Sequence, residues 1–197
     1  MTETIRTEIS SSLREEEVIV KISMYTMAID TFVPMLRSLS ELLDKGAQHA
    51  SANKLDPNAL VNARLAPDMY TLDKQVQFAC YNARNSTALL IGAESRPLDD
   101  NEKTLDDLKA RIAATVDYLR NLRANAFEGA EDREIRIPLP NDMQLEMTGV
   151  QFLRDWALPH FYFHVVTAYD ILRHSGVNIG KRDYLSYVGD AIRPIKK

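Results

Sequence analysis

The sequence predicts an all-α protein, a four-helix bundle with a short β-hairpin inserted before the last helix. Three observations support this prediction. Over four separate stretches, apolar residues recur at spacings of three and four, as they do along one face of a helix. Helix start and stop signals bracket most of these stretches. Between the third and fourth stretches, residues 133–147 alternate on either side of a Pro-Asn-Asp turn signal, which is typical of a hairpin.

The first helix is expected over residues 24–49. Pro34 lies inside this helix and should bend it, because proline has no backbone N–H to donate. The following residues, 51–66, read as a connection that contains Asp56-Pro57. The sequence therefore predicts one bent helix followed by a long loop.

The second helix is expected over residues 67–91, because proline suits the first helical position and Gly92 suits the stop. The third helix should begin where Thr104 and Asp107 have the spacing of a cap, and it should end near Ala124. Both stretches carry a continuous apolar stripe.

The last helix is the stretch around which the chain is organised. Thr148 and Gln151 form a capping-box start, and Gly176 follows the basic end of the helix as a stop. A spacing of about 100° per residue places one set of side chains, including two histidines, on the core face. This set is Leu153, Trp156, Ala157, His160, Phe163, His164, Thr167 and Ile171. The opposite side is also largely apolar, which indicates that both sides of the helix are packed against other structure. We favour a homodimer as the source of the second contact.

The composition limits the class of protein. The 197 residues fit one domain, and a net charge of -4 with interspersed signs argues against nucleic-acid binding. The single cysteine, Cys80, excludes an internal disulfide. The N-terminus lacks the features of a signal peptide, and no apolar run is long enough for a membrane span, so a cytoplasmic protein is expected. The expected parts are an N-terminal arm (1–22), the bundle (23–176) and a C-terminal tail (177–197).

His160 and His164 form an H-x-x-x-H pair, and residues at this spacing are neighbours on a helix. Two imidazoles so placed can hold one divalent ion, such as zinc, nickel or iron. The alternative is a pair of core or interface histidines with hydrogen-bond partners. Pro159 frees the carbonyl of Asp155 and bends the backbone just before the pair.

The second helix offers no histidine as a third ligand, but it carries side chains with oxygen donors. These are Asp68, Asp73, Gln75, Gln77 and Asn82. Gln77 and Asp73 lie one turn apart and can face a shared cavity, or they can belong to a solvated stripe. Cys80 lies among apolar residues and is interpreted as a small core residue rather than a nucleophile.

The stretch ALPHFYFHVVTAY at residues 157–169, followed by ILRHSGV at 171–177, resembles a domain-of-unknown-function branch of the DinB/YfiT-like superfamily. LAPDM before the second helix, FEGAEDR before the hairpin and GKRDYL near the end are similar to the same family. The resemblance implies a four-helix bundle that is usually a homodimer. Metal-binding members of the superfamily use one histidine on the second helix and an H-x-x-x-H pair on the last. His160 and His164 match that pair, whereas Gln77 or Phe78 stands at about the other position.

Two functions follow from these observations. The first is a non-catalytic, dimeric binding or structural module with a degenerate metal site. A pocket lined by Trp156, Phe163 and Tyr81 would accept a small apolar ligand. The alternative is a divalent-metal-dependent transferase or hydrolase that uses His160 and His164, with Gln77 or water completing the metal shell. The superfamily includes metal-dependent thiol transferases and hydrolase-like proteins, but the most similar branch has no established reaction.

Overall fold

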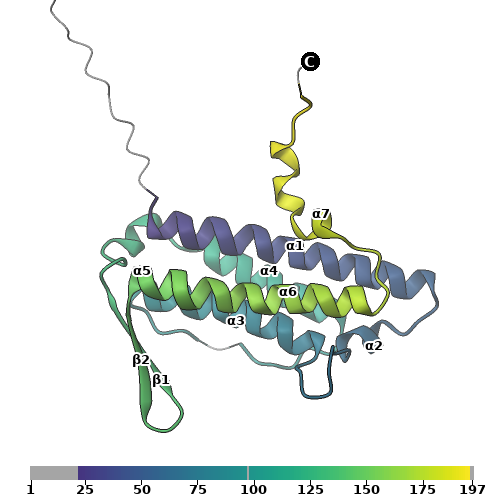
Figure 1. Cartoon of the computed structure of the whole chain (residues 1–197), viewed down its shortest axis with the longest axis horizontal. Helices are drawn as coiled ribbons and strands as arrows, with labels where there is room; N and C mark the ends of the chain where they lie inside the picture. The colour runs from purple at the N-terminus through teal and green to yellow at the C-terminus, as the bar shows by residue number, and fades with distance from the viewer. Residues whose placement is uncertain (1–21, 97, 196–197) are drawn as a thin grey trace, which may run out of the picture.

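The computed structural model describes residues 22–96 and 98–195. Four long helical units lie side by side in it (Figure 1), and each packs against two neighbours in the cyclic order α1, α4, α3, α6. The units are α1 (Met24–Ala52), α3 (Leu72–Ile91), α4 (Leu105–Asn121) and a last helix made of α5 (Gly149–Gln151), η2 (Phe152–Ala157) and α6 (Leu158–His174). The predicted four-helix bundle is therefore confirmed.

The core fills the space between the four units. Apolar side chains from all of them are buried there, and edge-to-face aromatic contacts are part of the packing. The rings of Phe32 from α1 and Phe161 from α6, for example, lie 4.8 Å apart and both side chains are fully buried. The core thus holds the first and last helices of the bundle together directly.

Side-chain caps fix where the helices begin. The predicted cap at Thr104 and the predicted capping box at Thr148 are confirmed. Both form capping boxes, in which the threonine accepts from a backbone N–H that lies three residues later. Ser23 caps α1 by accepting from the N–H of Thr26. The predicted glycine stops are also confirmed, since Gly92 and Gly176 adopt φ values of 70° and 91°, which side chains disfavour.

Two expectations about the first half of the chain were wrong. The α3 helix begins at Leu72 rather than at Pro67, because residues 63–71 form a loop closed by a 2.9 Å hydrogen bond from the Leu72 N–H to the Ala63 carbonyl. The connection after α1 contains a short helix, α2 (Pro57–Val61). Asp56 caps this helix and proline occupies its first position, a pairing that favours a helix start.

The last helix is not uniform. In η2 the backbone is a π-helix, in which the N–H of Leu158 donates to the carbonyl of Leu153, five residues earlier. Pro159 follows at once and has no N–H for the next α-helical bond. The disturbance expected before His160 therefore takes the form of a widened turn.

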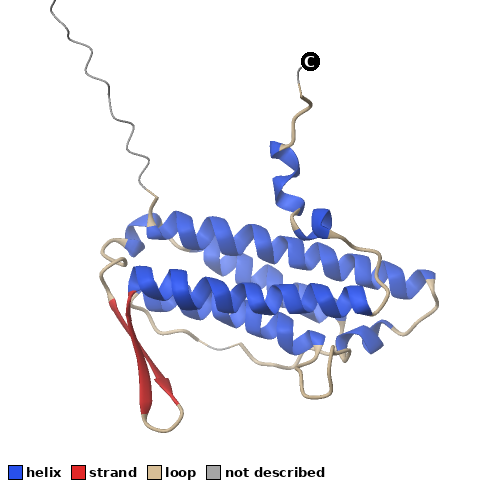
Figure 2. Cartoon of the chain, viewed as in Figure 1, coloured by secondary structure: helices blue, strands red, loops and turns tan. Residues whose placement is uncertain are grey.

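The hairpin consists of β1 (Glu134–Leu139) and β2 (Met143–Thr148), which pair antiparallel as a two-stranded sheet. Asn141 and Asp142 in the turn have positive φ, as the Pro-Asn-Asp signal predicts. A short helix, η1 (Ala124–Phe127), links α4 to this hairpin. Figure 2 shows the hairpin, in red, projecting from one end of the bundle and away from it.

The residues beyond the last helix include two further helices, α7 (Lys181–Tyr184) and η3 (Ser186–Ala191). Val177 and Ile179 are buried, so the start of the predicted tail packs into the core. η3 then points away from the bundle (Figure 1). The predicted N-terminal arm, residues 1–22, lies outside the described residues except for its last residue.

Candidate functional site

The centre of the candidate site is a buried hydrogen bond between α3 and α6. The Nδ1 atom of His164 lies 2.8 Å from the Oε1 atom of Gln75. The amide nitrogen of Gln75 donates to the carbonyl of Tyr70, which can only accept, so the amide oxygen faces the histidine. His164 therefore carries its proton on Nδ1, and its Nε2 atom is left as an unprotonated acceptor.

Both histidines of the predicted pair are neutral at pH 7. Burial, together with the neighbouring His160 ring, lowers the pKa of His164 from 6.5 to about 4. Partial burial of its ring also lowers the pKa of His160. The two ring centroids lie 5.2 Å apart, as expected for side chains one helical turn apart.

The last helix buries a different face from the one that the sequence predicted. Buried positions centre on Phe161, Val165 and Ala168, and His164 lies at the edge of this face with only 6% of its surface exposed. His160, which was expected in the core, is exposed, and so is Phe163. The buried face of the helix is thus shifted by about one residue position around the helix axis from the predicted face. The sequence pattern misplaced it because a helix that is apolar nearly all round has no sharp boundary between a buried and an exposed face.

A chain of ring contacts runs across the surface from α6 to the loop before α3. Successive centroids lie 5.0 to 5.4 Å apart, a distance typical of favourable aromatic pairs. We call this set the aromatic cluster; its members are Tyr70, Phe78, Trp156, His160, Phe163 and His164. Only His164 is buried in it, so the cluster forms a surface and not the lining of a closed cavity.

The three residues of the predicted pocket do not line one cavity. Trp156 packs on His160, and Phe163 packs on His164 with 58% of its own surface exposed. Tyr81 lines a separate cavity of about 250 Å³. The structure brings two of the three residues to the histidine pair, and it places them on an open face.

Gln77 lies away from the histidines. Its Nε2 atom donates to Glu102 at 2.8 Å, and its Oε1 atom is buried with no hydrogen-bond partner among the described residues. Two residues along a helix correspond to a rotation of about 200°, so Gln75 and Gln77 face nearly opposite sides of α3. The α3 side chain that hydrogen-bonds to the pair is therefore Gln75, not Gln77.

Gln77 belongs to a buried ionic network around Arg111 of α4. The guanidinium donates to Glu102 at 2.7 Å, to Asp100 at 2.9 Å and to the carbonyl of Asp99 at 2.9 Å. This network holds the loop before α4 against the bundle. Sequence reasoning missed Arg111, although its position between Leu108 and Thr115 puts it on the buried stripe of its helix.

Cys80 is fully buried, as predicted. Burial raises the pKa of its thiol to about 11, although a hydrogen bond with Thr115 acts in the opposite sense. The reactive thiolate is therefore scarce at neutral pH.

The site fits a catalytic metal ion only in part. His160 and His164 supply two neutral imidazoles, whereas catalytic zinc sites have three protein ligands. Among the described residues, no group of three or more histidine, cysteine, aspartate or glutamate side chains is placed to hold an ion. The oxygen of Gln75, the nearest amide, is already engaged by the Nδ1–H of His164. These residues do not make a three-ligand site.

The fold and the site define a helical-bundle protein with a histidine pair between its second and last long helices. Residues 24–185 match the family model described as a domain of unknown function (DUF1993). The chain belongs to this family, a branch of the DinB-like superfamily. It is 38% identical to a DinB family member from Shewanella denitrificans whose crystal structure is known, with a TM-score of 0.76 over 88% of this chain and 94% of that one. No curated protein matches the chain.

The described part of the chain has no helix with both the length and the apolar character that crossing a membrane requires.

Proposed function

We propose that this protein is a non-catalytic binding module that works as a homodimer, in which two copies pair through the aromatic cluster on α3 and α6. The observation that carries the proposal is the exposure of that cluster. Phe163 is 58% exposed and Tyr70 is 60% exposed, and they are connected through the buried ring of His164 and the half-buried ring of Phe78. Contiguous exposed apolar patches on soluble proteins mark interaction sites.

The shape of the surface favours a protein partner. Small-molecule sites are concave and enclose most of the ligand, whereas the rings of the cluster lie on an open helical face. Interface cores are enriched in aromatic residues. Tyr81 and Val166, both at least 40% exposed on the same two helices, extend the apolar surface available for contact. A second copy of the chain carries the same surface, so a two-fold axis would bury both patches in one interface.

Light scattering coupled to size-exclusion chromatography tests the proposal. The wild-type protein should have twice the 22.4 kDa mass of the chain at micromolar concentration. Phe163→Glu should shift it to a monomer, because a charge would be buried at the centre of the interface. Leu55 is an exposed apolar residue that is not part of the aromatic cluster. Leu55→Glu is therefore the matched control and should remain dimeric. A monomeric wild-type protein would overturn the proposal.

A two-histidine site for a divalent ion is a second candidate, and one observation favours it. Donation from Nδ1 of His164 to Gln75 leaves Nε2 free as a ligand, which is the arrangement that outer-shell partners impose on metal-binding histidines. Such a site could bind zinc, nickel or iron, and a transferase or hydrolase would need further ligands from solvent or substrate.

Elemental analysis of untagged protein tests this candidate. About one ion per chain in the wild type and none in His164→Ala would support it. A protein that stays free of these metals after incubation with each of them would exclude it. Val165→Ala, at the neighbouring buried position, controls for loss of metal through loosened packing.

A further inference from the structure

The β1–β2 hairpin has one face that is entirely apolar. Its register pairs Ile135 with Met147, Ile137 with Leu145 and Leu139 with Met143, and cross-strand partners point to the same side of the sheet. The alternate positions form the other face, which is mostly polar. They are Glu134 with Thr148, Arg136 with Glu146 and Pro138 with Gln144. Arg136 forms ion pairs with both glutamates, so the polar face suits contact with water.

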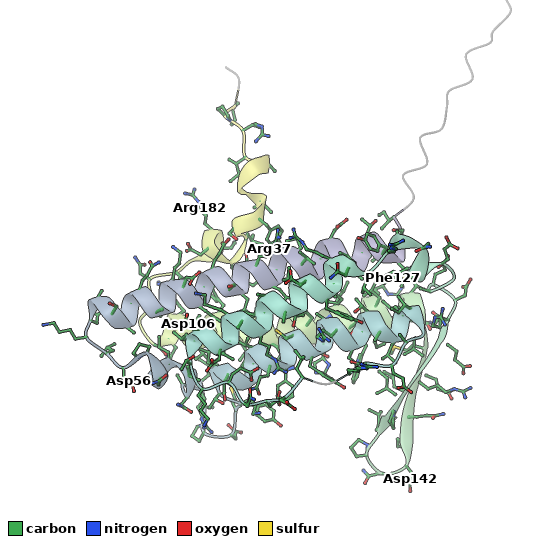
Figure 3. The ribbon with its side chains drawn as sticks, turned by 180° about the vertical axis from the view of Figure 1, so that it is seen from behind. Arg37, Asp56, Asp106, Phe127, Asp142 and Arg182 are labelled. Atoms are coloured by element: carbon green, nitrogen blue, oxygen red, sulfur yellow. The ribbon has the colours of Figure 1, made fainter. Side chains whose placement is uncertain are left out.

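The outer end of this apolar face is uncovered by the described part of its own chain, whereas Ile137 and Met147 are partly buried against the core. Ile135, at the base, is buried, but the exposed fraction reaches 37% at Leu139 and 65% at Met143 towards the tip. Figure 3 shows the tip, marked by Asp142, standing well away from the helices. A two-stranded hairpin alone is at best marginally stable in water, and packing against another element is what stabilises it.

We infer that the hairpin is an arm that grips a second copy of this chain, with its apolar face on the aromatic cluster of the partner. The inference rests on the proposed function, since it requires the homodimer. In a two-fold pair the contact occurs twice, because each copy offers one arm and one cluster. The arm is about 20 Å long, from six residues at about 3.3 Å each, and a helix is roughly 10 Å across. The arm can therefore lie across two packed helices of a partner.

The sizes of the two surfaces support the choice of a second copy. Aromatic side chains bury roughly 200 Å² each, so the cluster residues Tyr70 and Phe163 and the neighbouring Tyr81, at about half exposure, offer about 300 Å². A stable interface needs about 800 Å² from each partner. These three rings alone fall well short of this area. The uncovered outer end of the arm, at Leu139 and Met143, is further apolar surface that the same chain carries.

Two neighbouring positions on β2 provide a matched test. Met143→Glu adds a negative charge to the apolar face, and Gln144→Glu adds the same charge to the polar face one residue later. Sedimentation equilibrium should show that Met143→Glu weakens dimerisation by about ten-fold or more, with Gln144→Glu close to wild type. Both side chains are exposed in the single chain, so both variants should fold, which circular dichroism would check. If the wild type is a dimer and the two variants have equal dissociation constants, the inference that the arm contacts the partner would be overturned, and the proposed homodimer would stand. A monomeric wild type would overturn both.

A spin label on Met143→Cys reports on what covers the arm. Cys80 is buried, so only the introduced cysteine should react. The label should be immobilised in the dimer and become mobile when Phe163→Glu is added, and a label on Gln144→Cys should be mobile in both states. Immobilisation that persists in the monomeric variant would mean that the chain covers its own arm, and it would overturn the inference.

Discussion

Gln75 and His164, 89 positions apart in the sequence, are joined by a 2.8 Å hydrogen bond across the contact between α3 and α6. Both side chains are buried. This bond fixes the tautomer of His164 and connects the two helices that carry the aromatic cluster. The state of a single imidazole therefore depends on how these helices pack.

Replacing Gln75 with leucine should destabilise the protein. The Nδ1–H of His164 would stay buried without an acceptor, which costs about 1–3 kcal/mol of the free energy of unfolding. Urea denaturation measures this loss. Gln48→Leu, the same change at an exposed position of α1, should shift stability by about 0.5 kcal/mol or less. Nitrogen NMR of the wild-type histidine should show the proton on Nδ1; a proton on Nε2 would contradict the assignment.

Acid should destabilise the folded state through His164. Its pKa is about 4 in the folded state and 6.5 in the unfolded chain. The unfolded chain therefore binds more protons between these two pH values, and stability falls as the pH falls through this window. The loss from pH 7 to pH 5 should be about 2 kcal/mol. His164→Gln should flatten this dependence in urea titrations at several pH values. An equal slope in the variant and the wild type would assign the acid sensitivity to other groups.

Removing the guanidinium of Arg111 should be among the most damaging single changes. Arg111→Met would leave Glu102, whose side chain is only 8% exposed, as an unpaired buried charge, at a cost of about 3–5 kcal/mol. Adding Glu102→Gln should restore part of the stability, because it removes that charge. The double-mutant cycle, measured by thermal unfolding, should therefore be strongly non-additive. Additive losses would mean that the pair contributes little as a unit.

Gly149 should not tolerate a side chain. A Cβ atom there would lie 1.8 Å from the carbonyl oxygen of Ala130, and a backbone oxygen cannot rotate away. Gly149→Ala should therefore cost more than the roughly 1–3 kcal/mol of ordinary overpacking. At Gly189 an added Cβ would meet nothing within 4 Å, so Gly189→Ala should leave the melting temperature nearly unchanged. Similar melting temperatures for the two variants would contradict the close approach.

Local signals allowed much of the fold to be predicted. The caps at Thr104 and Thr148 and the stops at Gly92 and Gly176 were confirmed because each acts within four residues of sequence. The start of α3 was predicted wrongly at Pro67. Proline is compatible with a first helical turn but does not require one, and a hydrogen bond from Leu72 to Ala63, nine residues earlier, holds this segment as a loop.

Less of the candidate site could be predicted from the sequence. The proximity of His160 and His164 follows from helical spacing, and the ring contact confirms it. The choice between Gln75 and Gln77 depends on how α3 is rotated against α6, and an apolar stripe does not fix that rotation to within one residue. The exposure of His160 depends on the same rotation. The opposite faces of the hairpin follow from alternation, whereas its projection from the bundle depends on tertiary packing.

The π-helical segment η2 also bears on how the length of this chain can change during evolution. A π-turn accommodates one residue more than an α-turn, so this segment is a place where the helix can hold an additional residue without breaking. Removing one residue between Phe152 and Ala157 should convert the segment to an ordinary α-helix and leave the hydrogen bonds on both sides intact. Homologues one residue shorter at this position are thus expected to keep the histidine pair in register with α3, while the hairpin at the other end would be turned relative to the bundle.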